Sequence, residues 1–259
     1  MATKYPIVLV HGIALKDFKM FKAFGRIERM LRADGYTVST ADTDSFGKIE
    51  TNAEQLRDYI NGVTEATGAE RVNIIAHSKG GLDTRYMIDR LGMAARVASV
   101  TFLCTPHKGS QIATKIYAMP RPVSRFLAFW LNLGYRITGD RQPDSLEVCR
   151  QLSSAPDGVL EEFAPADGIY MQSYSTKLDR PRDDFVMGIP LIFSRRFEQD
   201  VSDGLVSEDS SKFADYRGRC VDGSVSHSEI VDFMVKSSKK EKIYAFYREL
   251  CADLAKRGY

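Results

Sequence analysis

The fold of this chain is decided by the stretch Val72-Asn73-Ile74-Ile75-Ala76-His77-Ser78-Lys79-Gly80-Gly81. Its first half is a short apolar run rich in β-branched residues, which is typical of a buried parallel strand. The run ends at Ser78, and apolar residues at helical spacing follow through Leu91. Ala76 and Gly80 are small enough to allow a sharp turn between strand and helix. This arrangement is the context of a nucleophile elbow, so Ser78 is the predicted nucleophile.

A second buried-strand pattern lies near the N-terminus, from Tyr5 to Val10, and ends in His11-Gly12-Ile13. Acyl transfer through a tetrahedral intermediate needs two N–H donors aimed at the developing oxyanion. The backbone N–H groups of Ile13 and Lys79 are the two predicted donors. Because the backbone acts in both cases, the side chains at these positions matter little. His11 is interpreted as a residue that props this loop.

A serine hydroxyl needs a base, and the base needs a carboxylate that orients it. The chain has four histidines, which are His11, His77, His107 and His227. The side chain of His77 must diverge from that of its neighbour Ser78, and His107 is expected to pack near the elbow. His227 lies late in the chain on a Gly/Ser-rich loop, which is where this architecture places its base.

The predicted carboxylate is Asp203, in Val201-Ser202-Asp203-Gly204-Leu205-Val206. A glycine and then an apolar pair follow it, so that the turn is fixed and the side chain can point inward. Asp200 and Asp209 are rivals that we interpret as solvated loop charges. The resulting chain order of serine, aspartate and histidine is that of α/β-hydrolases, unlike the orders of the trypsin and subtilisin types.

These motifs together resemble the bacterial triacylglycerol lipases of the Pseudomonas, Burkholderia and Proteus type. The resemblance spans residues 5 to about 235, and its most family-specific string is Thr105-Pro106-His107-Lys108-Gly109-Ser110. It implies an α/β-hydrolase fold, a triad of Ser78, Asp203 and His227, and oxyanion donors at Ile13 and Lys79. Ala76 departs from the glycine common at that position, without a steric consequence.

The resemblance also raises the question of a structural calcium ion near the catalytic histidine. The aspartate that the family places two residues past that histidine is matched here by Glu229, and Asp183 or Asp184 offers a second oxygen ligand. Calcium takes six to eight oxygen ligands, and the sequence shows too few to require the ion. The predicted reaction requires no cofactor, and the sequence leaves a structural calcium ion open.

Strand and helix patterns alternate along the chain, which favours one α/β domain over residues 1–259 with a mostly parallel sheet covered on both faces. The expected strands and helices are 7–10, a helix carrying Met20 to Leu31, 36–40, a helix near 53–67, 72–76, the elbow helix, 97–103, a strand near 168–175 and a terminal helix through Leu254.

This alternation breaks between about residues 111 and 167, which predicts an insertion at the edge of the active site. Within it, the segment from Val123 to Tyr135 is apolar almost all round and holds the only tryptophan. A helix this apolar is expected to be buried. The functional interpretation is a lid that closes on an acyl pocket and opens at a lipid surface. An ordinary buried helix and a dimer contact are the alternatives.

Composition excludes other classes. The chain has 259 residues, 44% of them hydrophobic, and 36 basic against 34 acidic residues give a net charge of +2. With basic and acidic residues so nearly balanced, the chain has no large positive electrostatic field that would favour binding to nucleic acid. No apolar run is long enough for a transmembrane helix, and no signal peptide precedes the first strand. The expectation is a cytoplasmic protein, or a secreted one whose leader has been removed. The cysteines, Cys104, Cys149, Cys220 and Cys251, lack metal-ligand spacing.

The sequence thus predicts a serine carboxylester hydrolase of lipase type that acts on acylglycerols or other fatty-acyl esters. An esterase, thioesterase or acyltransferase using the same triad is the alternative. A catalytically silent hydrolase fold that acts as a binding module is the interpretation from a different class. The expected partners are an ester or lipid substrate and a transient lipid-interface contact through the lid.

Overall fold

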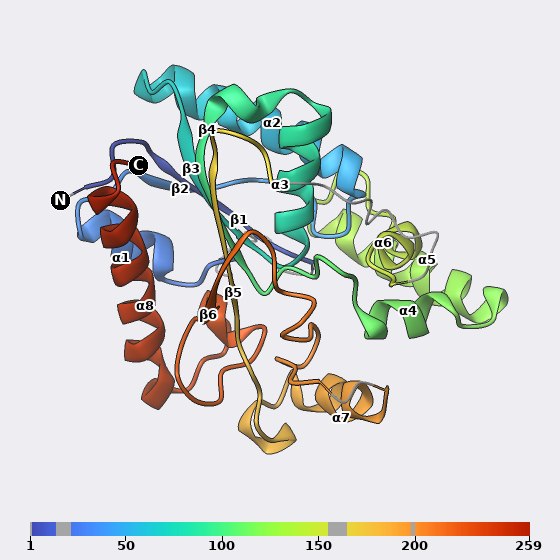
Figure 1. Cartoon of the computed structure of the whole chain (residues 1–259). Coiled ribbons are helices and arrows are strands. Elements are labelled where there is room, and N and C mark those ends of the chain that lie inside the picture. The colour runs from blue at the N-terminus through green and yellow to red at the C-terminus, as the bar shows by residue number, and fades with distance from the viewer. Residues whose placement is uncertain (1, 14–21, 155–164, 198–199) are drawn as a thin grey trace.

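A six-stranded parallel sheet forms the centre of the molecule (Figure 1). The computed structural model describes residues 2–13, 22–154, 165–197 and 200–259. The strand order is β2-β1-β3-β4-β5-β6, and every neighbouring pair is parallel. The strands are β1 (Ile7–Val10), β2 (Val38–Thr40), β3 (Val72–His77), β4 (Val97–Leu103), β5 (Tyr170–Ser175) and β6 (Asp215–Arg219).

Helices follow the strands in the alternation that the sequence predicts. The α-helices are α1 (Ile27–Ala33), α2 (Ile49–Thr67), α3 (Lys79–Arg90), α4 (Gln111–Tyr117), α5 (Arg121–Ile137), α6 (Ser145–Gln151), α7 (Gly188–Phe197) and α8 (Ser237–Lys256), and the 3-10 helices are η1 (Met93–Arg96), η2 (Pro181–Asp183) and η3 (Glu229–Val231). Within the described part of the chain, every helix is too short or too polar to cross a bilayer.

Helices cover both faces of the sheet (Figure 1), and each face carries its own apolar core. On one face, Ile7 and Leu9 of β1 pack with α1 and α8, whose fully buried residues include Ile27 and Tyr247. On the other face, β1, β3 and β4 pack against α2 and α3. Strands buried on both faces explain why their sequences are continuous apolar runs rather than alternating patterns.

Most of the expected elements are confirmed, and the differences lie at their ends. The strand expected over 36–40 is shorter, and the helix expected near 53–67 begins earlier, at Ile49. The helix expected from Met20 begins only at Ile27, while Met20 itself lies outside the described residues. Just after His227 the chain forms only a single 3-10 turn, η3. Strand β6 was not predicted, because its sequence Asp-Tyr-Arg-Gly-Arg is polar and its side chains are half-buried or exposed.

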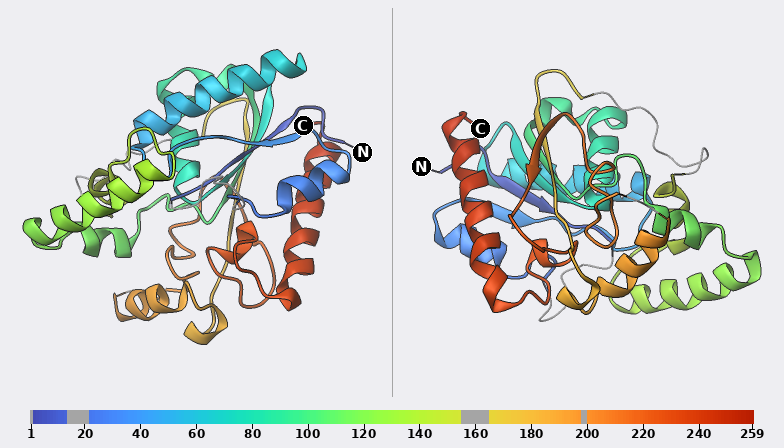
Figure 2. Two further views of the ribbon diagram at one scale, coloured as in Figure 1. Left: turned by 180° about the vertical axis from the view of Figure 1, so that it is seen from behind. Right: turned by 60° about the horizontal axis from the view of Figure 1, so that its bottom comes forward.

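The insertion predicted for residues 111–167 contains α4, α5 and α6, and its residues 155–164 lie outside the described part of the chain. Helix α5 extends outward from the rest of the molecule (Figure 2). The expectation that its apolar residues are buried is wrong: Phe126 is 64% exposed and Trp130 is 57% exposed. Ser124 is the only buried residue of this helix. No lid motion follows from this placement, so the lid stays a prediction.

Candidate active site

Ser78 occupies a strained turn between β3 and α3. Its backbone has φ 54° and ψ −131°, a combination that residues with a side chain rarely adopt and that clusters at functional sites. Its N–H donates to the Leu103 carbonyl of β4 at 2.9 Å, which ties the turn to the sheet. The turn also needs Gly12, because a Cβ there would lie 2.6 Å from the Ser78 Cβ. The predicted elbow geometry is present.

A chain of hydrogen bonds joins Ser78, His227 and Asp203. The Ser78 hydroxyl lies 2.8 Å from His227 Nε2, and His227 Nδ1 lies 2.7 Å from Asp203 Oδ2. A carboxylate can only accept, so Nδ1 carries the proton and Nε2 accepts from the serine. All three side chains are buried. This arrangement can remove a proton from Ser78 and stabilise the resulting imidazolium.

The loop after α7 fixes Asp203. Its Oδ1 accepts the N–H groups of Leu205 at 2.9 Å and Val206 at 2.8 Å, which leaves Oδ2 for the histidine. The backbone N–H of His227 donates to the Asp203 carbonyl at 3.0 Å, so acid and base loops are also joined by their backbones. Gly204 has φ +113°, where a side chain would strain the turn and meet Met187.

The two rival carboxylates lie elsewhere. Asp209 forms an exposed ion pair with Lys108 at 2.8 Å, and the hydrogen bond from that lysine lowers the pKa of Asp209. Asp200 is exposed and accepts the N–H groups of Val201 and Asp209. Neither carboxylate contacts His227, as the sequence comparison of the three aspartates predicted.

His77 supports the base loop, a role that the sequence did not indicate. Its Nε2–H donates to the His227 carbonyl at 3.0 Å, and the two rings lie 4.6 Å apart. Burial, and next the charge of His227, keep the pKa of His77 well below its ordinary value, so that the ring stays neutral. His77, the residue next to Ser78, therefore holds the backbone of His227 in place.

The other two histidines have structural contacts. His11 Nδ1 lies 2.9 Å from the Gly12 carbonyl, and its Nε2 lies 3.2 Å from that of Thr43, consistent with a prop for this loop. His107 accepts a hydrogen bond from Arg85 of α3 at 2.9 Å and stacks on Phe213. Its pKa is lowered by burial and then by Arg85. It therefore packs beside the elbow helix, as predicted.

Ile13 and Lys79 were predicted as the oxyanion donors. Ile13 follows Gly12 in the loop after β1, and it lines the cavity that contains Ser78. Lys79 is the first residue of α3, where backbone N–H groups have no partner within the helix and the helix dipole favours negative charge. The arrangement can therefore present two N–H groups to an anion at Ser78.

The Lys79 side chain is buried beneath the elbow, which was not expected. Its Nζ lies 2.7 Å from Asp83 Oδ1, and both side chains are 1% exposed. Asn52 of α2 donates to Asp83 Oδ2 at 3.1 Å and to the Asp44 carbonyl at 2.8 Å. Burial, only partly opposed by Lys79, raises the pKa of Asp83 to about 6. This cluster joins the elbow helix to α2 and to the loop before it.

An apolar cavity of about 430 Å³ opens at Ser78 and His227. Its other walls come from the loops after β1 and β2, from the insertion and from the segments around α7, and include Ile13, Phe46, Ile112, Ile116, Leu152, Val186, Met187 and Leu205. These elements follow the carboxyl ends of the strands, where open α/β sheets bind their ligands. The cavity can hold an acyl chain, at about 0.8 kcal/mol for each methylene removed from water.

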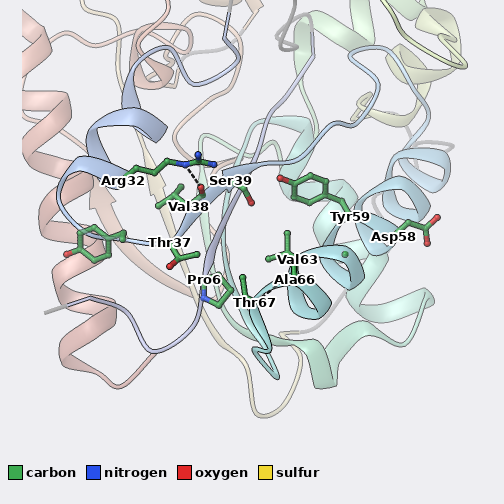
Figure 3. A pocket seen from close by; sticks show the side chains of 12 residues that line it. Pro6, Arg32, Thr37, Val38, Ser39, Asp58, Tyr59, Val63, Ala66 and Thr67 are labelled. Atoms are coloured by element: carbon green, nitrogen blue, oxygen red, sulfur yellow. Dashed lines mark hydrogen bonds between the residues drawn. The ribbon is translucent and has the colours of Figure 1, made fainter.

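A larger hollow of about 630 Å³ lies at the other edge of the sheet, between β2 and α2 (Figure 3). Arg32 lines it and donates to the Val38 carbonyl at 2.7 Å. Asp58 and Tyr59 of α2 also line it. No histidine, cysteine or serine at a strained turn is among its lining residues. By volume alone this hollow would be the better candidate for a binding site, but the hydrogen-bonded Ser78, His227 and Asp203 lie at the smaller cavity.

The residues that the resemblance suggested for calcium do not fit the ion. Both carboxylate oxygens of Glu229 contact Lys239 Nζ, at 2.8 and 2.6 Å, and Oε2 also accepts the Ser226 N–H. Asp184 accepts the hydroxyl groups of Ser226 and Ser228, and Asp183 accepts that of Ser224. A lysine ammonium thus already supplies the positive charge beside Glu229. We derive no step through calcium.

One group of possible metal ligands occurs in the described part of the chain, formed by Cys104, Asp203 and His227. Two of its members are the acid and base described above, and their atoms are engaged with each other and with Ser78. The Cys104 thiol lies 3.3 Å from the Thr176 hydroxyl, and burial raises its pKa well above the ordinary value. A protonated thiol is a poor metal ligand.

Residues 6–138 match the family model described as palmitoyl protein thioesterase. The chain is 32% identical over 182 residues to a triacylglycerol lipase of Pseudarthrobacter phenanthrenivorans, covering 65% of this chain and 56% of that protein. A triacylglycerol lipase of Burkholderia plantarii is also 32% identical over 182 residues, covering 65% and 50%. The chain therefore spans about half the length of these curated relatives.

Solved structures show the same architecture. The crystal structure of a metagenomic carboxyl esterase superposes with a TM-score of 0.71 at 15% identity, covering 96% of this chain and 75% of that one. An identity this low speaks for the fold alone. It confirms the fold class that the sequence predicted, an α/β-hydrolase fold with a mostly parallel sheet.

Proposed function

The chain belongs to the palmitoyl protein thioesterase family, and on that premise we propose that it is a serine carboxylester hydrolase of lipase type. The observation that carries the proposal is the hydrogen-bonded series Ser78, His227 and Asp203 at the mouth of an apolar cavity. Likeness to triacylglycerol lipases over 65% of the chain supports the same activity.

In the proposed reaction, Ser78 Oγ attacks the carbonyl carbon of a bound ester while His227 Nε2 takes its proton. Asp203 keeps the imidazole in the required tautomer and stabilises its positive charge. The N–H groups of Ile13 and Lys79 stabilise the oxyanion. His227 then protonates the leaving alcohol, and water attacks the acyl-enzyme by the same proton route in reverse.

The proposed substrates are acylglycerols or other fatty-acyl esters, because the cavity beside Ser78 is lined almost wholly by apolar side chains. Its polar lining is concentrated at the reacting groups, which suits a substrate with one ester and a hydrocarbon chain. Each methylene that enters such a cavity adds a few-fold to specificity until the cavity is full.

The insertion is proposed to act as the lid of this site. Helix α4 lines the cavity through Ile112 and Ile116, and α5 follows it with exposed aromatic residues. Contact of this segment with a lipid interface would bring the cavity mouth to the substrate. The proposal therefore includes a transient lipid-interface contact.

The test is a series of p-nitrophenyl esters from acetate to palmitate, with emulsified triglyceride, for the natural sequence and for Ser78→Ala. We expect a preference for medium or long acyl chains and a loss on the order of 10⁴-fold or more in the variant. A serine-directed phosphonate should label the natural protein and leave the folded Ser78→Ala protein unlabelled. Substantial turnover or labelling in the variant would overturn the nucleophile assignment.

A thioesterase is the second candidate, since the matched family model describes palmitoyl protein thioesterases. The same triad serves both reactions, and only the leaving group differs. Matched palmitoyl oxyester and thioester substrates distinguish them: the lipase proposal expects hydrolysis of emulsified triglyceride, whereas a thioesterase would hydrolyse the thioester alone.

A further inference from the structure

Helix α5 is amphipathic, but it turns its apolar face to solvent, whereas an ordinary surface helix turns its apolar face to the protein. Its residues that are buried or half-buried are Ser124, Ala128, Asn132 and Tyr135, at the spacing of one helical face. Ser124, Ala128 and Asn132 are small or polar, and Tyr135 packs against the ring of Phe46. Asn132 Oδ1 accepts the N–H of Ser145 at the start of α6 at 2.9 Å. The polar face of this helix is thus the one that holds it to the protein.

The outward face of α5 carries the large apolar side chains. Phe126, Phe129 and Trp130 are 64%, 60% and 57% exposed, and Ile137 is 75% exposed. Soluble proteins rarely leave so many apolar side chains together on one surface. A helix that presents such a face to solvent needs something that covers it.

A second exposed apolar group lies across the cavity. Phe185 is 93% exposed, and Ile189, Ile192 and Phe193 on α7 are also exposed. Helix α4 packs against both α6 and α7. Val186 and Met187, which lie between Phe185 and Ile189, line the cavity that contains Ser78. The second apolar group therefore stands on a segment that borders the cavity, and α5 packs against α6, whose Cys149 lines the same cavity.

The charge of this region differs from that of the rest of the chain. Residues 111–139 contain four basic residues and no acidic residue. The whole chain has 36 basic and 34 acidic residues, so the remainder has 32 and 34 and a net charge of −2. Three of the four basic residues, Arg121, Arg125 and Arg136, are exposed on α5 itself. Positive charge is thus concentrated beside the exposed aromatic residues.

From this combination we propose that α5 docks on an anionic phospholipid surface, with its aromatic residues inserted among the acyl chains and its arginines at the headgroups. Amphipathic helices that lie in a membrane interface have this composition, and basic residues near the surface are attracted by anionic lipid. A neutral lipid surface or a second copy of this chain would leave the three arginines without a matching charge. The role of this docking surface rests on the proposed hydrolase function, because it would bring the enzyme to its lipid substrate. Docking itself can be measured without any ester hydrolysis.

Binding is measured with Ser78→Ala protein, which keeps its surface and cannot degrade the lipid. Sedimentation uses vesicles of phosphatidylcholine, and vesicles in which about a third of the lipid is phosphatidylglycerol. Trp130 is the only tryptophan, so its fluorescence reports directly on α5. We expect sedimentation and a blue shift with the anionic vesicles, both weakened by salt, and little of either with the neutral vesicles.

The charge-removal variant is Arg121→Gln with Arg125→Gln and Arg136→Gln. At about fivefold for each arginine, partition onto the anionic vesicles should fall on the order of 100-fold. The matched control is Arg29→Gln with Arg71→Gln and Arg96→Gln, three exposed arginines outside the insertion. The control should bind like its parent, since it changes the net charge equally but leaves α5 unaltered.

Three results would overturn the proposal. Equal binding to neutral and anionic vesicles would mean that the arginines do not select the surface. If both triple variants lost vesicle binding equally, the net charge of the protein, and not the arginines of α5, would explain the binding. A blue shift that grows with protein concentration in the absence of lipid, together with a dimer by light scattering, would mean that a second copy covers α5. Loss of ester hydrolysis by Ser78→Ala tests the proposed function separately from all three.

Discussion

The strained backbone of Ser78 is held by its neighbours rather than by its own preference. Such a conformation costs on the order of 1–3 kcal/mol, and the N–H bond to Leu103 and the absence of a side chain at Gly12 make it tolerable here. In return the hydroxyl stands clear of the sheet at the start of α3. Strain at this position therefore supports the proposal that Ser78 reacts.

Asp203→Asn should lower kcat by about 10⁴-fold. The amide can donate to His227 Nδ1, which then favours the tautomer that cannot accept the Ser78 proton. Asp203 is the only one of the three neighbouring aspartates that contacts His227. The measurement is kcat and KM on a soluble p-nitrophenyl ester.

Asp209→Asn is the matched control, because it makes the same chemical change in the same loop region at an exposed ion pair with Lys108. It should retain activity within a few-fold, since exposed ion pairs contribute at most about 1 kcal/mol. A mild Asp203→Asn variant beside a damaging Asp209→Asn variant would refute the assignment of the carboxylate.

Lys239 should be needed to hold the His227 loop. It contacts both oxygens of Glu229, a carboxylate whose side chain is only 2% exposed. Lys239→Met would leave that charge buried beside Ser226, at a cost of about 3 kcal/mol. We expect kcat to fall more than KM rises, and Lys239→Arg to restore most of the loss. Chelation with EDTA should leave the natural protein's activity unchanged, and calcium-dependent activity would contradict this reading of the loop.

The core strands and the site motifs could be predicted because their signals are local. A buried strand such as β4 is one apolar run, and the elbow around Ser78 is a contiguous string. The contact of His77 with the His227 carbonyl could not be predicted, because it depends on how β3 meets a loop 150 residues away. The burial of Lys79 depends likewise on α2 covering the elbow helix.

Helix α5 shows why composition misled the prediction. The expectation of burial rests on the number of apolar residues, whereas the side that faces the protein is set by Ser124, Ala128, Asn132 and Tyr135. Their regular spacing was present in the sequence. The sequence thus contained a signal: residues repeating at helical spacing that form a mostly polar face. Such a face, turned toward the protein, predicts that the apolar face points outward.

Helix α3 should tolerate loss of its buried ion pair only when both partners are removed. Lys79→Met or Asp83→Leu alone leaves one charge buried without its partner, which costs about 3–5 kcal/mol. The double variant should be within about 2 kcal/mol of the natural protein, or more stable. Urea unfolding measures these differences. Additive losses in the double variant would show that the pair itself contributes stability.

The same pair predicts a pH dependence of unfolding. The pKa of Asp83 is raised by burial from 3.8 to about 6, so the folded protein binds a proton there more tightly than the unfolded chain does. Stability from this group is present below about pH 4 and is lost as pH rises through about 6. Relative to the double variant, the natural protein should therefore gain stability as pH falls from about 7 to 4. A difference that is flat, or of opposite sign, would contradict the raised pKa.

The parallel sheet is what brings distant parts of the chain into one site. Ile13, Ser78 and His227 follow β1, β3 and β6, and Asp203 lies between β5 and β6. Since all the strands are parallel, these segments meet at the same edge of the sheet. The site therefore depends on strands from both halves of the sheet.

The four cysteines give a test of how the molecule opens. All four are free, and Cys104, Cys220 and Cys251 lie in one core between the sheet and helices α1 and α8. Cys149 is half-buried and lines the cavity at Ser78, with a pKa raised by burial to about 11. Dithionitrobenzoate should therefore react slowly with Cys149 in the folded protein. The other three thiols should become reactive together, at the urea concentration where the core unfolds.

Two controls accompany this measurement. Cys149→Ser should remove the slow phase alone, and dithiothreitol should not shift the unfolding midpoint. If Cys104 reacted before the core unfolded, these thiols would not share a single closed core. A midpoint lowered by the reductant would mean that two of them form a disulfide.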